Sequence, residues 1–234
     1  MSDHPSGPPA AGVSPTGLPA PVSSVVRAHR GVLVAVWRGD PSGALRWAAR
    51  RWFWLWVFAV NAVVGALAWT TVLPMVSRMS SMVGRTALGL DGSVSRPHVS
   101  GSQLVLVGVA GLVTTFVVQL LRVVAVRLTF AVREAPARFA HATLPVATGA
   151  AVLTVAYLVA SVVCLVPATS PWFGVVPAAV VAIPVLAAEI LVFLALERTV
   201  PLTRSLLVPH TLLTVAWAVA AGMVTALAVH LAPV

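Results

Sequence analysis

Within the long apolar segments of this sequence, Glu189 is the residue that packing alone explains least well. It lies about eight residues before Glu197 and Arg198, a depth of roughly 12 Å in a helix. An ionised carboxylate that deep in an apolar environment is costly, so it usually faces a basic partner or a water-filled cavity. Glu189 could bind a proton, a cation or a cationic substrate. It could also form an ion pair that holds two helices together, or be a protonated carboxyl without a function of its own.

Arg122 is the predicted partner of Glu189, because both residues lie towards the same, cytoplasmic side of the membrane in the second and the fourth apolar run. Gln119 precedes Arg122 by one helical turn, so the sequence predicts a buried polar site made of Glu189, Arg122 and Gln119. Small and polar residues on one helix face let helices approach and hydrogen-bond. We interpret such faces mainly as packing surfaces. They are Asn61, Gly65 and Ala68 in the first apolar run; Gly108, Gly111, Thr115, Gln119 and Arg122 in and just after the second; Thr154, Tyr157, Ser161 and Cys164 in the third; and His210, Thr214, Trp217 and Ala221 in the fifth.

Catalytic, cofactor-binding and metal-binding patterns are missing from the sequence. Cys164, the single cysteine, lies among Val and Leu residues, which favours an inert thiol. There is no HExxH motif, Gly-rich phosphate loop, GxSxG elbow or pair of carboxylates for acid and base catalysis. Asp91 and His98 could together hold a metal, although a solvated turn explains them better. We therefore expect a protein that is not an enzyme and that has no cofactor.

The composition places these residues in a membrane. Hydrophobic residues make up 59% of the 234 positions and charged residues 9%, whereas soluble domains carry roughly one quarter charged residues. The bias towards Arg, Ala, Val, Gly and Pro is typical of a GC-rich bacterial genome, so we expect the bacterial cytoplasmic membrane. The net charge of +9 comes from Arg residues at the ends of apolar runs. Anionic lipid headgroups, and not nucleic acid, are therefore the expected partner.

Five apolar runs are long enough to cross a hydrocarbon core of about 30 Å as helices. They predict an all-α membrane bundle over residues 52–232, and the prolines Pro177 and Pro184 predict a bend in the fourth run. Because Arg122 is followed by three further Arg residues up to Arg138, we expect the second helix to leave the membrane there and continue along the surface. The predicted spans are residues 52–72, 103–121, 141–166, 175–196 and 209–231.

Two segments precede the first span. Residues 1–24 are rich in Pro, Ser and Gly and predict a disordered tail. Residues 25–51 mix Arg with apolar residues and predict a basic juxtamembrane segment, in which Asp40 caps a helix that begins at Pro41. Between the first two spans, residues 75–102 predict a short interfacial helix followed by a loop.

The distribution of Arg residues predicts the orientation of the chain. If the N-terminus is inside, twelve of the 15 Arg residues lie on the inner side and three, Arg78, Arg85 and Arg96, on the outer side. Cytoplasmic segments are the ones enriched in basic residues. The N-terminus is therefore expected in the cytoplasm and the C-terminus outside.

The cytosolic tail, the Gly39, Asp40 and Pro41 turn shortly before the first span, and the odd set of five helices resemble the bacterial Yip1-domain membrane proteins. The resemblance covers residues 30–231 and rests on architecture. It implies a compact five-helix membrane protein whose eukaryotic relatives are linked to membrane organisation and trafficking. It assigns no functional residue.

Two functions from different classes fit these features. The first is a non-enzymatic scaffold or interaction protein that could bind other membrane proteins, favoured by the missing catalytic residues. The second is a small transporter, or the membrane subunit of a transport complex, that uses Glu189. A water-accessible cavity that reaches Glu189 would favour transport, and a closed, dry bundle would favour the scaffold.

Overall fold

The computed structural model describes residues 22–87, 100–134, 138–165, 175–199 and 205–231. All regular secondary structure in these ranges is helical, which confirms the predicted all-α class for the described part of the chain. Seven helices follow one another: α1 (Val22–Trp37), α2 (Pro41–Ala48), α3 (Phe53–Ala87), α4 (Gly101–Val132), α5 (Phe139–Cys164), α6 (Val175–Thr199) and α7 (Leu207–Leu231).

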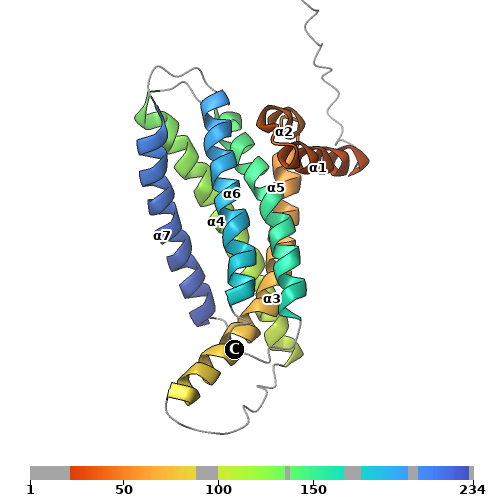
Figure 1. Ribbon diagram of the computed structural model, residues 1–234, viewed down its shortest axis with the longest axis vertical. Helices are drawn as coiled ribbons and strands as arrows, with labels where there is room; N and C mark the ends of the chain where they lie inside the picture. The colour runs from red at the N-terminus through yellow and green to blue at the C-terminus, as the bar shows by residue number, and fades with distance from the viewer. Residues whose placement is uncertain (1–21, 88–99, 135–137, 166–174, 200–204, 232–234) are drawn as a thin grey trace, which may run out of the picture.

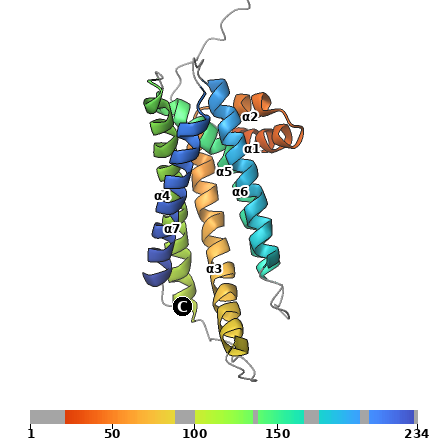
Figure 2. The same ribbon diagram turned by 60° about the vertical axis from the view of Figure 1, so that its left-hand side comes forward.

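The five long helices α3 to α7 run alternately in opposite directions along the molecule (Figures 1 and 2). Helix α3 packs against both α4 and α5, and α4 also contacts α5. Helix α6 packs along α5, whereas α7 packs along α4. The helices therefore form a curved row in the order α7, α4, α3, α5, α6, and α6 and α7 are the two ends of that row.

The short helices α1 and α2 lie across one end of the bundle (Figure 1). Ala28 and Val32 of α1 are fully buried in a core with residues of α3 to α6. The predicted cap is confirmed, because the Asp40 side chain accepts a hydrogen bond from the Gly43 backbone N–H at 2.8 Å and Pro41 occupies the first turn. Arg198 at the end of α6 also donates to Ser42 Oγ at 2.6 Å. These contacts fix α1 and α2 on the bundle.

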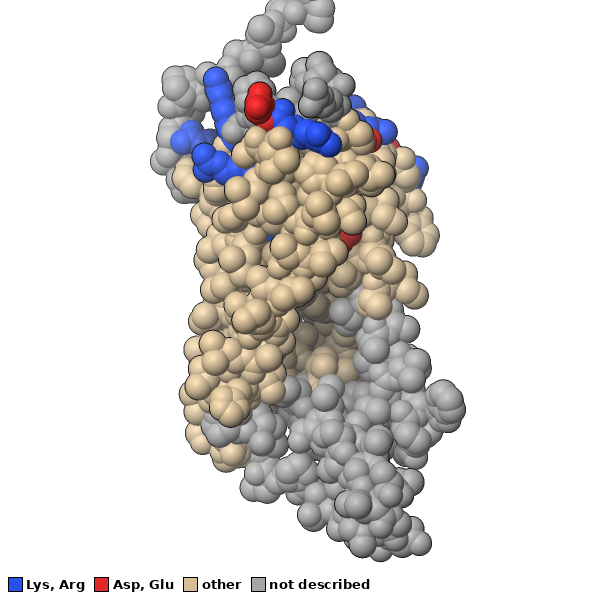
Figure 3. Space-filling model, turned by 90° about the vertical axis from the view of Figure 1, so that its left-hand side faces the viewer, with Lys and Arg blue, Asp and Glu red and all other residues tan. Residues whose placement is uncertain are grey.

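Four helices in the described part of the chain have the length and hydropathy to cross a membrane: Phe53–Val72 within α3, then α4, α5 and α7. Composition and helix length are thus those of a multi-pass membrane protein. The Arg residues of α1, α2, the α5 start and the α6 end gather with those of the α4 end at one end of the molecule, where Figure 3 shows nearly all of the blue atoms.

The second helix differs from its prediction. It does not turn onto a surface after residue 121 but continues as one helix to Val132. Arg122 is 4% exposed, and Val126 and Phe130 beyond it are completely buried. The prediction that the chain lies along the surface from Arg122 onwards is therefore wrong, because a buried partner removes the reason for a charged residue to leave the bundle.

Two other boundaries also differ from prediction. Helix α3 continues past Val72 to Ala87, where a separate interfacial helix was predicted. Helix α1 begins at Val22, which lies inside the segment predicted as a tail. Residues 1–21 themselves lie outside the described residues.

Candidate functional site

Close packing of α3 against α4 fixes the backbone on which the polar site is built. A Cβ atom placed on Gly65 of α3 would lie 2.5 Å from Thr115 Oγ1 of α4, and one on Gly111 of α4 would lie 2.6 Å from Trp69 of α3. Two helices can approach this closely only where one of them carries glycine. Both glycines belong to the predicted small-residue faces, and their role in packing is confirmed.

Asn61 fixes α3 against α5. Its Nδ2 donates to the Ala150 carbonyl at 2.7 Å and to Thr154 Oγ1 at 3.2 Å, and the side chain is 1% exposed. The Thr154 hydroxyl in turn donates to the same Ala150 carbonyl at 2.9 Å. A hydrogen-bonded cluster of this kind holds the two helices at one rotation and one height, because an apolar environment offers the amide no alternative partner.

Arg122 joins three helices, and we call its contacts with Glu189, Thr214 and Trp217 the Arg122 bridge. The Nη2 nitrogen of this α4 residue is paired with the Glu189 carboxylate of α6, and its Nη1 nitrogen donates to Thr214 Oγ1 of α7 at 3.1 Å. The guanidinium carbon lies 4.8 Å from the ring centre of Trp217, also on α7. The predicted contact between Arg122 and Glu189 is therefore present, and the planar guanidinium adds a third helix to it.

Gln119 lies one turn from Arg122 and is 7% exposed. Its Nε2 donates to the Thr115 carbonyl at 3.2 Å. Its Oε1 and the Nε of Arg122 have no hydrogen-bond partner within the described residues. Buried polar atoms in proteins are normally satisfied, so an acceptor and a donor remain at the site for a water molecule or a bound solute.

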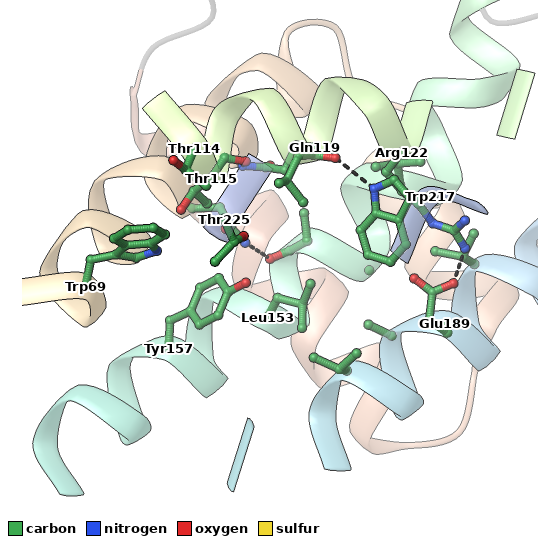
Figure 4. Close-up of a pocket in the computed structure, with 18 residues that line it drawn as sticks. Trp69, Thr114, Thr115, Gln119, Arg122, Leu153, Tyr157, Glu189, Trp217 and Thr225 are labelled. Atoms are coloured by element: carbon green, nitrogen blue, oxygen red, sulfur yellow. Dashed lines mark hydrogen bonds and ion pairs between the residues drawn. The ribbon is translucent and has the colours of Figure 1, made fainter. Parts of the chain in front are cut away.

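A cavity of about 150 Å³ lies beside these groups (Figure 4). Helices α3 to α7 all contribute to its wall, and it reaches both Arg122 and Glu189. A single water molecule occupies about 30 Å³ of liquid volume, so the cavity has room for a few waters or one small solute. Its polar and aromatic lining consists of Asn61, Trp69, Thr114, Thr115, Gln119, Arg122, Tyr157, Glu189, Trp217 and Thr225.

The cavity lies where the curved row of helices is incomplete. Within the described residues, α6 and α7 are not packed along each other, although the rings of Phe193 and His210 lie 5.4 Å apart. The Arg122 bridge is therefore a principal connection between α6 and α7. The Glu189 side chain keeps 23% of its surface exposed, against 5% for Arg122. Figure 3, which looks at the molecule from the α7 side, shows that this face is hollowed.

All three residues of the predicted polar site, Glu189, Arg122 and Gln119, line this one cavity. Thr214 and Trp217 were identified as part of a polar face but not as partners of Arg122. Trp69 and Thr225 were not identified at all. Their helical spacing gave no signal that separates a cavity wall from packing, because the sequence does not say which helix faces are neighbours.

Within the part of the chain that the structure describes, the remaining candidates form no second site. No group of three or more His, Cys, Asp or Glu residues suited to a metal occurs among the described residues. Asp91 and His98 lie outside them. Cys164 is a partly buried free thiol at the end of α5. Pro184 lies inside α6, as its position in the fourth run predicted.

No protein-family model matches the sequence, and comparison with curated proteins and with solved structures found no significant similarity. The fold and the site therefore define a class only: an α-helical bundle of the multi-pass membrane type with a polar cavity in its interior.

Proposed function

We propose that this chain is a five-span protein of the bacterial cytoplasmic membrane, with its N-terminus in the cytoplasm and its C-terminus outside. Helix α6, the fourth of the long helices in chain order, adds a fifth span to the other four, because its 25 residues correspond to about 37 Å, enough to cross the hydrocarbon core. The clustering of described Arg residues at the end that holds α1 and α2 supports this orientation. Anionic headgroups of the inner leaflet then face these residues.

Within that membrane protein, we propose that the cavity binds a small polar solute or ion, as part of a small transporter or of the membrane subunit of a transport complex. The observation that carries this proposal is that the cavity reaches Glu189, whose side chain keeps 23% of its surface exposed, as expected beside an accessible cavity and not in a closed, dry bundle. Intramembrane ionisable residues at a cavity typically mark ion or substrate pathways. The unpartnered Gln119 Oε1 adds an acceptor at the same place.

Flux measurements on the full chain in proteoliposomes test this proposal. Entrapped dyes report the movement of H⁺, Na⁺, K⁺ and ammonium in turn. We expect one of these fluxes to exceed that of empty vesicles and to fall in Glu189→Gln. The control Glu197→Gln removes an exposed carboxylate near the α6 end and should leave the flux unchanged. Wild-type fluxes equal to those of empty vesicles for all four ions would contradict a self-contained transporter.

A non-enzymatic scaffold is the second candidate, and the close packing of α3, α4 and α5 favours it. Gly65, Gly111 and Asn61 make this part of the bundle a fixed frame. The proposed Yip1-domain relationship points in the same direction, because relatives of that kind are linked to membrane organisation. Crosslinking in native membranes separates the two functions: stable membrane-protein partners unaffected by Glu189→Gln would favour the scaffold.

A further inference from the structure

A groove between α1 and α2 carries four Arg residues on its rim. Arg27, Arg30 and Arg38 of the α1 segment and Arg46 of α2 line an open pocket of about 440 Å³ at the basic end of the bundle. All four side chains are exposed. Ligand pockets in proteins measure roughly 300–1,000 Å³, so the groove has the size of a binding site.

The floor of the groove is built by close packing. A Cβ atom on Gly31 would overlap the ring of Trp47, so glycine is required for α2 to lie this close to α1. The Trp47 ring also carries the Arg50 guanidinium at 4.6 Å from its centre. The rim residues are thus attached to two helices that hold each other in a fixed arrangement.

The charge of the groove is mostly uncompensated. Asp40 is the acidic residue in its wall, and its carboxylate already accepts from the Gly43 N–H at 2.8 Å and lies 3.5 Å from Arg46. Arg27, Arg30 and Arg38 form no salt bridge within the described residues. Guanidinium groups match the oxygens of a phosphate in pairs, so the chemistry of the groove selects a phosphate-bearing anion.

The position of the groove identifies the source of that phosphate. Helix α1 lies across the end of the bundle (Figures 1 and 2). Its last residue, Trp37, is 92% exposed. Trp residues are enriched in the headgroup layer, where the apolar ring and the indole N–H both find suitable surroundings. Ala28 and Val32 bury the opposite face of α1 against the bundle. The helix therefore has the position of an interfacial helix, with its arginines at headgroup level.

We propose that the α1–α2 groove is a binding site for the phosphodiester headgroup of an anionic phospholipid. The site takes one headgroup among Arg27, Arg30 and Arg38. This goes beyond orientation by a diffuse basic end, because it assigns the lipid to one place. It is independent of what occupies the cavity beside Glu189.

Equilibrium binding of labelled phosphatidylglycerol to the full chain in neutral mixed micelles tests the proposal. The groove variant is Arg27→Gln/Arg30→Gln/Arg38→Gln. The matched control, Arg51→Gln/Arg127→Gln/Arg138→Gln, removes three exposed charges from the same end but outside the groove. Each charge near an anionic surface changes binding by about fivefold, so diffuse attraction predicts the same weakening in both variants. We expect the groove variant to bind at least about tenfold more weakly than the control.

Two results would overturn the proposal. One is equal binding by the two triple variants. The other is equal displacement of the label by inorganic phosphate and by unlabelled phosphatidylglycerol, since that would identify a site for free phosphate. The variant Arg27→Lys/Arg30→Lys/Arg38→Lys keeps the charge and replaces the groove variant if that one does not fold. It too should bind more weakly than wild type, because Lys lacks the paired donors of Arg.

Discussion

The two sides of the bundle are held together in different ways. Helices α3, α4 and α5 meet through glycines, through Asn61 and through apolar side chains, and α3 packs along both of its neighbours. Helices α6 and α7 each pack along one long helix and are joined to each other through the Arg122 bridge and the Phe193 and His210 rings. The first region is a frame fixed by shape, whereas the second depends on a few polar contacts around a cavity.

The largest expected effect is on the Arg122 bridge. Arg122→Gln leaves Glu189 without its basic partner, and breaking one side of a buried pair costs about 3–5 kcal/mol in unfolding free energy. The unfolding free energies of wild type and Arg122→Gln, both measured in mild detergent, give this cost as their difference. The double variant Arg122→Gln/Glu189→Gln should recover part of it, because no unpaired charge remains. Equal stability of the single and the double variant would show that the pair does not hold α6.

The frame formed by α3, α4 and α5 should become less stable when a methyl group is added between α3 and α4. Gly111→Ala places a methyl group against Trp69, and overpacking of this kind costs about 1–3 kcal/mol. Gly108→Ala on the same helix is the control, since its Cβ would lie 3.5 Å from the nearest atom, in Thr70, an ordinary contact. The comparison of the two melting temperatures checks this prediction. A normal melting temperature for Gly111→Ala would mean that α3 and α4 are not closely packed.

The polar contact within the frame should have a smaller effect. Asn61→Leu removes the hydrogen bonds to Ala150 and Thr154, and interhelical hydrogen bonds in membranes contribute about 1 kcal/mol. Thr154→Val removes one of the two. A double-mutant cycle between these positions should give a positive coupling energy, and a coupling of zero would argue against the contact.

The smallest expected effect is the contribution of His29, a residue of α1, to the pH dependence of folding stability. Burial in α1 lowers the pKa of His29 from its ordinary value of 6.5. Below pH 6.5 the unfolded chain therefore binds more protons at this residue than the folded one, and stability falls as the pH falls. Unfolding at pH 7 and pH 5 should show a smaller pH dependence in His29→Gln than in wild type. The same pH dependence in both would assign it to another group.

Sequence patterns predicted the helical class and the polar site better than the helix boundaries. Glu189 and Arg122 were predictable as partners because each is costly to bury alone in an apolar run. The same cost produced the error after Arg122, where the charge was taken to start a surface segment. Thr214 could not be assigned to Arg122, because helix order around the bundle depends on side-chain packing between distant segments. The Asp40 cap was predictable because it depends only on residues three positions apart.

Accessibility along α6 tests the central claim, that a polar cavity reaches Glu189, most directly. Val185 lies one turn from Glu189 and lines the cavity, whereas its neighbour Leu186 is 65% exposed on the outer face of α6. In a Cys164→Ala background, Val185→Cys and Leu186→Cys are treated with a small, water-soluble thiol reagent in membranes. We expect Val185→Cys to react and Leu186→Cys, which the proposed α6 span would place against lipid, to remain unmodified. An unreactive Val185→Cys, or faster reaction at Leu186→Cys, would contradict the account.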